Sequence, residues 1–321
     1  MPKQPLKVLF ANRAHPALKE RLEALGFQCE EDLQSPMELI AAKIHGYTGL
    51  VLRSRISVPA ALIERAEQLR FIAREGIGLE HIDVEFAEEK GIIVFNSPEG
   101  SADTVGEHAI GLLLGLLNHI PRADQQVHAG LWERESNRGI EILGKTIGII
   151  GYGNTGKAFA RKISGFGAKV LAFDKFLIDY GDNFAEAVSL QRIWEEADIV
   201  TIHIPYSGEN QYFINKAFLE AFEKPIFLIN TARGLVLHTA DLVDALESGQ
   251  VLGAALDVLE YEKSSFEQIQ IDELPAPFQY LIQSDRVVLS PHIAGWSEES
   301  KARHGIILAD KIEQWWKAQE H

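Results

Sequence analysis

The chain has 321 residues, of which 46% are apolar, and its 31 basic and 46 acidic side chains give a net charge of −15. This length exceeds what one hydrophobic core usually supports, so we expect two domains. The negative charge disfavours nucleic acid and an anionic membrane surface as partners.

The cysteine content and the amino terminus indicate the compartment. The single cysteine, Cys29, excludes an intrachain disulfide and disfavours a cysteine-based metal site, so we expect no bound metal. The chain enters a strand within a few residues and lacks the apolar stretch of a signal peptide. Its most apolar run, 109–117, is about half of the ~20 residues that a membrane span needs. We expect a cytoplasmic protein without a membrane segment.

Strands and helices alternate strictly through the first hundred residues. We expect strands at 7–12, 27–32, 49–54, 69–75 and 92–97, and helices at 17–26, 36–44, 59–68 and 81–91. This alternation is typical of a parallel sheet with helices on both faces.

The pattern changes at a long apolar helix over 102–120, which a polar link through Arg138 follows. A second alternating series then predicts strands at 146–151, 169–174, 198–204, 225–232, 251–258 and 286–290, with helices at 159–167, 189–197, 215–223 and 239–249. Residues 263–285 read as a surface loop with some helix, and 298–319 as a final helix. We therefore expect an α/β fold of two doubly wound parallel-sheet domains, with chemistry in a cleft between them, at the carboxyl ends of their strands.

A glycine-rich turn predicts a dinucleotide site. Gly151, Gly153 and Gly156 have the spacing GxGxxG between a strand and a helix, which allows a tight turn, a close approach of a pyrophosphate and helix packing. Asp174 ends the next strand, where a carboxylate would bind ribose hydroxyls and repel a ribose phosphate. The arrangement favours NAD over NADP.

Later strand ends carry residues suited to acid and base chemistry. Arg233, Glu262 and His292 supply a cation for a substrate carboxylate, a group that orients a base, and the base itself. Each also has a structural alternative. Arg233 could cap a helix, Glu262 could be a solvated loop charge, and His292 could belong to a turn.

The ordered motifs GYGNTG, AFD, HIP, NTARG, DVLEYE and SPHIAG resemble those of the D-isomer-specific 2-hydroxyacid dehydrogenase family along essentially the whole chain. The resemblance implies a Rossmann NAD-binding domain, 101–291, inserted into a flavodoxin-like substrate domain, 1–100 and 292–321. This insertion explains why the glycine turn begins near the middle of the chain. It also implies a homodimer formed through the NAD-binding domain.

The resemblance also implies roles for single residues. Arg233 would bind the substrate carboxylate, His292 would be the general acid and base, and Glu262 would hydrogen-bond His292, which favours the imidazolium form. The residues implied around NAD, with Asp257 near the nicotinamide carboxamide, are Gly151, Gly153, Asn154, Thr155, Gly156, Asp174, His203, Pro205, Thr231, Ala232, Asp257 and Gly295.

The expected substrate is a small 2-hydroxy or 2-keto acid. Arg53 and Arg55, on either side of Ser54, would project to one face of a strand end and bind a phosphate; this RSR tripeptide resembles that of D-3-phosphoglycerate dehydrogenases. The loop AREGIG, 73–78, resembles the family loop whose backbone amides help to hold the carboxylate, which implies this role for Gly76 and Ile77. These features favour oxidation of 3-phosphoglycerate, the reaction of serine biosynthesis.

Several alternatives remain open at this point. The RSR tripeptide could be an ordinary basic strand end, and a glyoxylate or hydroxypyruvate reductase of the same family is the second reading. A third is an NADH-sensing binding protein that recruits partners. We expect no serine-binding regulatory domain after residue 321.

Overall fold

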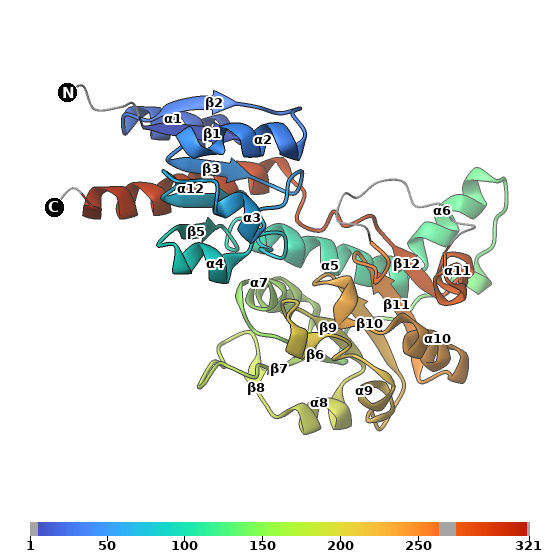
Figure 1. The fold of residues 1–321 in the computed structure, drawn as a ribbon. Helices are drawn as coiled ribbons and strands as arrows, with labels where there is room; N and C mark the ends of the chain where they lie inside the picture. The colour runs from blue at the N-terminus through green and yellow to red at the C-terminus, as the bar shows by residue number, and fades with distance from the viewer. Residues whose placement is uncertain (1–5, 263–273, 320–321) are drawn as a thin grey trace, which may run out of the picture. The chain divides into compact units, whose positions relative to one another are not determined.

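The computed structural model describes residues 6–262 and 274–319 (Figure 1). It divides the chain into two compact units, Met1–Ser101 with Trp296–His321, and Ala102–Gly295. The divisions predicted from the sequence lie at 100/101 and 291/292. His292 therefore belongs to the second unit in the structure, and the assignment of substrate and dinucleotide to separate units stays a prediction.

The first unit contains a five-stranded parallel sheet in the order β2-β1-β3-β4-β5, the flavodoxin-like order. Its elements occur in the predicted order, although α3 is much shorter than the predicted 59–68. They are β1 (Lys7–Phe10), α1 (Pro16–Ala24), β2 (Gln28–Glu31), α2 (Met37–Lys43), β3 (Gly49–Leu52), α3 (Ala60–Ile63), β4 (Phe71–Arg74), α4 (Val84–Glu89), β5 (Ile93–Asn96) and α12 (Glu298–Gln319).

Alternating side chains of the first sheet build a core on each face. Leu9 and Leu50 pack with Ile40 and Ile63 of α2 and α3, whereas Val8 and Phe10 pack against α1 and α12. Figure 1 shows α12, in red, beside the blue strands of this unit. The carboxyl-terminal helix therefore completes the domain that the amino terminus began.

The second unit contains a seven-stranded sheet in the order β12-β11-β10-β9-β6-β7-β8, all parallel. This is the Rossmann order with one added strand. Its elements are α5 (Ala102–Leu117), α6 (Ile120–His128), β6 (Thr146–Ile150), α7 (Asn154–Ile163), β7 (Lys169–Phe173), β8 (Glu186–Ala187), α8 (Leu190–Glu196), β9 (Ile199–Ile202), α9 (Lys216–Glu220), β10 (Ile226–Asn230), α10 (Thr239–Ser248), β11 (Val251–Leu256), α11 (Ala276–Gln283) and β12 (Val287–Leu289).

Three details differ from the sequence analysis. The long helix ends at Leu117, because His119 adopts a left-handed φ of 53°. The expected polar link contains a second helix, α6, and the two-residue strand β8 was not predicted. Of the segment 263–285, α11 confirms the expected helix, while residues 263–273 lie outside the described residues. Within the described ranges, no helix combines the length and apolarity that a bilayer crossing requires.

A buried histidine joins α12 to the end of β5. The His304 side chain is 5% exposed, and its Nδ1 lies 2.8 Å from Oγ of Ser97. A Cβ on Gly100 would lie 2.4 Å from that nitrogen, so the close contact requires glycine. Burial lowers the pKa of His304 to about 4 from an ordinary 6.5, and the ring is neutral in the folded protein.

This shift makes the stability of the first unit depend on pH. In the unfolded chain this histidine binds a proton as the pH falls below 6.5, whereas in the folded protein it does so only near pH 4. The free energy of unfolding therefore falls as the pH is lowered from 7 toward 4. Between pH 7 and pH 5 we expect this to lower the free energy of unfolding by about 2 kcal/mol. His304→Gln, which keeps an amide for Ser97, should remove that portion of the pH dependence.

Urea titrations at the two pH values test this. Unfolding is monitored by tryptophan fluorescence, to which Trp315 and Trp316 on the same helix contribute. The exposed histidine variant His45→Gln is the control and should match the wild type. An equal loss of stability in His304→Gln and wild type would contradict the assignment.

Candidate active site

The glycine turn joins β6 to α7 with little space for side chains. Gly151 has a φ of +94°, and its Cβ would lie 2.8 Å from the carbonyl of His203. A Cβ on Gly156 would lie 2.2 Å from the Gly151 oxygen. A Cβ on Gly153, in contrast, would meet no described atom within 4 Å beyond its chain neighbours. Protein packing thus requires the outer two glycines, and the middle one borders open space.

The amino-terminal end of α7 fits the phosphates of a dinucleotide. Gly153 occupies its N-cap position and provides no side-chain acceptor. The first intrahelical bond in this turn runs from the Lys157 N–H to the Gly153 oxygen, so the amides of Asn154, Thr155 and Gly156 have no acceptor within the helix. Such amides and the helix dipole attract an anion.

Asp174 lies directly against this turn. Its Oδ2 accepts the Tyr152 N–H at 2.8 Å, and its Oδ1 accepts the N–H groups of Phe176 and Leu177 at 2.9 and 3.1 Å. Three amides therefore fix the orientation of the carboxylate. The structure brings the predicted ribose partner next to the glycine turn, as the strand order requires.

The end of β9 carries His203 and Pro205, which the sequence analysis placed around NAD. The His203 side chain lies in the interior, with its Nε2 3.0 Å from Oγ1 of Thr201 and its ring against Phe159. Burial lowers the pKa of His203 to about 3, so the ring stays neutral. Its backbone, rather than its ring, borders Gly151. Pro205 is exposed, and its carbonyl accepts an N–H from Asn210.

The loop after β10 is held by a residue that the sequence analysis missed. The fully buried Asn230 accepts the Ala232 N–H at 3.0 Å and donates to the Arg233 carbonyl at 3.1 Å. A Cβ on Gly234 would lie 1.9 Å from the Leu259 oxygen, so this loop packs tightly on the loop after β11. Asn230 was detectable as a polar residue that ends a wholly apolar strand.

One buried hydroxyl in this loop lacks a partner. The Oγ1 atom of Thr231 makes no hydrogen bond to any described residue. A buried hydroxyl without a partner is costly, unless a ligand supplies one. Together with the uncapped helix and the space beside Gly153, it indicates that the residues present fit a bound dinucleotide.

His292 and Glu262 form a hydrogen-bonded pair. Their Nδ1 and Oε2 atoms are 2.7 Å apart, and the side chains are 29% and 20% exposed. The other oxygen of Glu262 accepts the Leu259 N–H, which fixes the carboxylate. The pair therefore fixes the orientation of the imidazole through Nδ1. Arg233 follows β10 in the same unit, and its Nη1 donates to the Ala232 carbonyl at 2.8 Å.

Asp257 binds the protein through both carboxylate oxygens. It is 1% exposed and accepts hydrogen bonds from Ser290, Ile293 and Ala294. Gly295, which the sequence analysis placed near the cofactor, directly follows this group and is half-buried. Ser290 and its neighbour His108 were also missed, because their role depends on contacts between distant segments.

In the first unit, the two arginines that were predicted to face one phosphate, Arg53 and Arg55, have different partners. The prediction assumed that strand alternation continues through Arg55, but β3 ends at Leu52. Arg55 donates to the carbonyls of Ala11, Ser35 and Asp32 at 2.7 to 2.8 Å. Three backbone acceptors thus hold its guanidinium.

Arg53 has different neighbours. Its Nε lies 3.8 Å from Oε2 of Glu75, and its guanidinium lies 5.7 Å from the centre of the Trp296 ring. Ser54, between the two arginines, is exposed. Burial raises the pKa of Glu75, which is 1% exposed and accepts the His15 N–H at 2.9 Å.

The predicted carboxylate loop is also only partly available. The Gly76 N–H donates inward to Oγ of Ser97 at 3.1 Å, so it is not directed to a substrate. Gly76 has a φ of +144°, and a Cβ there would lie 1.2 Å from Nη1 of Arg74. Ile77 is half-buried, and its carbonyl accepts an N–H from Asn96 at 2.8 Å.

Comparisons with known proteins agree with this arrangement. The family model described as D-isomer specific 2-hydroxyacid dehydrogenase, NAD binding domain, matches residues 110–294. A hydroxypyruvate reductase from Thermotoga maritima is 37% identical over 92% of this chain and 91% of its own length. A D-3-phosphoglycerate dehydrogenase from Archaeoglobus fulgidus is 33% identical over 96% of this chain and 56% of its own length. The chain thus spans little more than half of the second relative.

The solved structures support the same conclusion. An NADPH-dependent glyoxylate/hydroxypyruvate reductase from Sinorhizobium meliloti, in complex with NADP and malonate, has a TM-score of 0.80 at 27% identity. The match covers 98% of this chain and 94% of that structure. By its glycine turn, its histidine and glutamate pair and the extent of these matches, the chain belongs to the D-isomer-specific 2-hydroxyacid dehydrogenases and carries their NAD-binding domain.

Proposed function

We propose that the protein interconverts a D-2-hydroxy acid and its 2-keto acid with NAD, and that 3-phosphoglycerate is its substrate in the oxidative direction, as in serine biosynthesis. The observation that carries the reaction type is the His292 and Glu262 pair, in the same unit as the glycine turn and Asp174. NAD, when bound, supplies the hydride chemistry of such a reaction.

The side chains have separate tasks in this proposal. His292 takes the hydroxyl proton on Nε2 during oxidation and returns it during reduction. The Glu262 carboxylate at Nδ1 fixes the orientation of the ring. Arg233 pairs with the substrate carboxylate, and the fixed carboxylate of Asp174 accepts hydrogen bonds from the ribose, which disfavours a 2′-phosphate.

Loss of the acid and base pair should slow turnover without loss of cofactor binding. We expect His292→Gln to lower kcat by about 10²- to 10⁴-fold. Glu262→Gln should lower kcat by about 10- to 100-fold, since a misoriented base still reacts at some rate. Absorbance at 340 nm gives kcat, and NADH fluorescence gives a Kd that should stay unchanged.

The exposed variant His45→Gln is the control for this series and should behave as wild type. If His292→Gln turns over as fast as wild type, the proposed role is wrong. If wild type binds NADH tightly but turns over no hydroxy or keto acid, the NADH-sensing alternative is favoured instead.

The substrate proposal depends on the surroundings of Arg53. A phosphate near this guanidinium would gain a charged partner, and several relatives are D-3-phosphoglycerate dehydrogenases. One observation favours a second candidate, reduction of hydroxypyruvate or glyoxylate. Because Arg55 is held by backbone carbonyls, only Arg53 remains of the pair, beside the carboxylate of Glu75. The Thermotoga maritima relative is a hydroxypyruvate reductase.

Separate arginine variants distinguish these substrates. If phosphate binds Arg53, Arg53→Ala should lower kcat/KM for 3-phosphoglycerate by about 10-fold or more and change that for glycerate less. Arg55→Ala should instead lower the thermal midpoint, because three backbone carbonyls lose their donors. Initial rates with NAD and with NADP across 3-phosphoglycerate, glycerate, hydroxypyruvate and glyoxylate test both. Equal effects of Arg53→Ala on all substrates would exclude a phosphate site.

We also propose that the protein is a homodimer through its NAD-binding domain and resides in the cytoplasm. None of the residues of α6, all described, is buried, and apolar side chains on and after it are exposed, among them Ile120 (53%), Val127 (53%), Leu131 (51%) and Trp132 (79%). Exposed apolar groups of this extent are typical of an interface.

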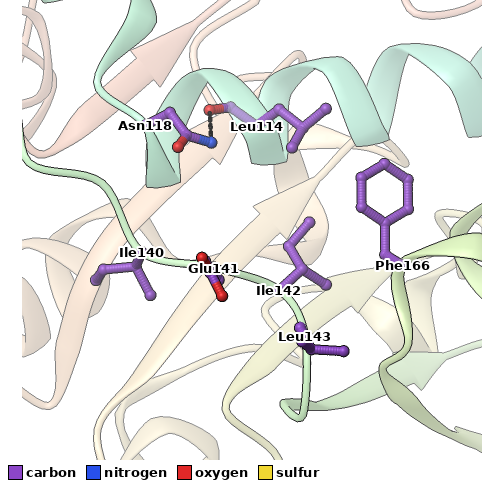
Figure 2. Close-up of a pocket in the computed structure, with 7 residues that line it drawn as sticks. All are labelled: Leu114, Asn118, Ile140, Glu141, Ile142, Leu143 and Phe166. Carbon is purple, nitrogen blue, oxygen red and sulfur yellow. Dashed lines mark hydrogen bonds between the residues drawn. The ribbon is translucent and has the colours of Figure 1, made fainter.

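The same unit also contains a small pocket. The pocket has a volume of about 260 Å³. Figure 2 shows the residues that line it, which are Leu114, Asn118, Ile140, Glu141, Ile142, Leu143 and Phe166. It contains none of the predicted site residues.

Charges on this surface should separate the protomers. We expect Val127→Asp with Trp132→Ala to convert a dimer to a monomer, because a carboxylate buried at the interface loses its hydration. Light scattering after size exclusion gives the mass. Leu39→Asp, at an exposed apolar position of the first unit, is the matched control. A monomeric wild type would contradict the proposal.

A further inference from the structure

His292 has a backbone conformation that needs support. Its φ of 55° lies in the left-handed region, which is unfavourable for a residue with a side chain. Three successive backbone N–H groups, those of residues 292–294, donate hydrogen bonds to Asp257. The His292 N–H donates to the Asp257 carbonyl at 2.8 Å, and the next two amides donate to its Oδ1 and Oδ2 at 2.9 and 2.7 Å. Asp257 therefore holds the loop in the shape that presents His292.

Asp257 in turn depends on a helix distant in sequence. Burial opposes its ionisation, yet hydrogen bonds from His108, Ser290 and two amides hold the pKa of Asp257 below its ordinary value. His108 lies on α5, which packs against β11 and β12 in the same unit. Asp257 and Ser290 follow these two strands, so His108 faces the ends of both.

The order of donors can be derived from the distances. Oγ of Ser290 lies 2.6 Å from Oδ1 of Asp257, and a carboxylate only accepts, so the hydroxyl proton points to Asp257. That hydroxyl has no second proton for His108, whose Nε2 lies 3.0 Å away. His108 must therefore donate from Nε2. The same nitrogen lies 3.5 Å from Oδ1 of Asp257.

We propose that His108 is a positioning residue for His292, acting through Ser290 and Asp257. The proposal rests on the proposed role of His292 as acid and base. The imidazole Nε2–H fixes the Ser290 hydroxyl, the hydroxyl fixes the carboxylate, and the carboxylate fixes the loop amides. A site whose reactive group is set by a supporting layer loses rate when that layer loosens.

Two variants of His108 distinguish the loss of its hydrogen-bond donor from the loss of its side-chain volume. His108→Leu fills similar space without a donor, and His108→Gln places an amide N–H near the position of Nε2. We expect His108→Leu to lower kcat by about 10- to 100-fold, with the Kd for NADH unchanged. His108→Gln should recover most of that rate. Glu107→Gln, a neighbour on α5 whose carboxylate pairs with Lys162 at the surface, is the matched control.

A double variant tests whether the residues act in series. Ser290→Ala should resemble His108→Leu, and the combined variant should be no slower than the slower single one, because either change breaks the same chain. If kcat of the combined variant falls by the product of the two single losses, the proposal is overturned. It is also overturned if His108→Leu keeps the full kcat.

Histidine ring signals in ¹⁵N and ¹³C NMR spectra give a readout that does not depend on turnover. The His292 signals, assigned by their loss in His292→Gln, should shift or broaden in His108→Leu and return in His108→Gln. If no hydroxy acid is turned over by any form, the proposed function fails, and the NMR result alone decides the positioning. Unchanged His292 signals in His108→Leu would overturn it.

Discussion

The parallel arrangement of the strands is the constraint on which the candidate site depends. Parallel strands have all their carboxyl ends at one edge of a sheet. In the second unit, the glycine turn, Asp174, Thr231, Asp257 and Ser290 each follow a strand of one sheet, although more than a hundred residues separate the first from the last. Helices on both faces hold the strands in this order through two apolar cores.

Buried polar groups then determine the shape of this edge. Asn230 and Asp257 are almost fully buried, and each satisfies the backbone of the loop that follows a strand. Close backbone contacts at Gly151 and Gly234 lock neighbouring loops together. A charge such as that of Asp257 is tolerated in the interior because several donors surround it. The apolar cores therefore hold the strands in place, and the buried polar groups fix the loops at their carboxyl ends.

Much of this could be predicted from periodicity and turn residues. The alternation of apolar runs with amphipathic helices predicts the strands and the major helices, and GxGxxG with Asp174 predicts the dinucleotide turn. Contacts that depend on the path of a loop could not be predicted in this way. Arg55 leaves the face of Arg53 because β3 ends three residues earlier. Strand alternation gives no information beyond the last paired residue.

The sequence by itself determined the fold class, the order of the elements and the family, because these depend on local propensity, hydrophobic spacing and short motifs. The family resemblance already implied that His292 pairs with Glu262 and that the final helix returns to the first domain, and the structure gives the pair a distance of 2.7 Å and packs α12 on the first sheet. Only the tertiary structure decided that three backbone carbonyls bind Arg55. It also decided that His108 reaches Ser290, 182 positions away along the chain. Hydrogen bonds extend over about 3 Å and depend on angle, so the partner of a side chain is set by where the packed elements bring it.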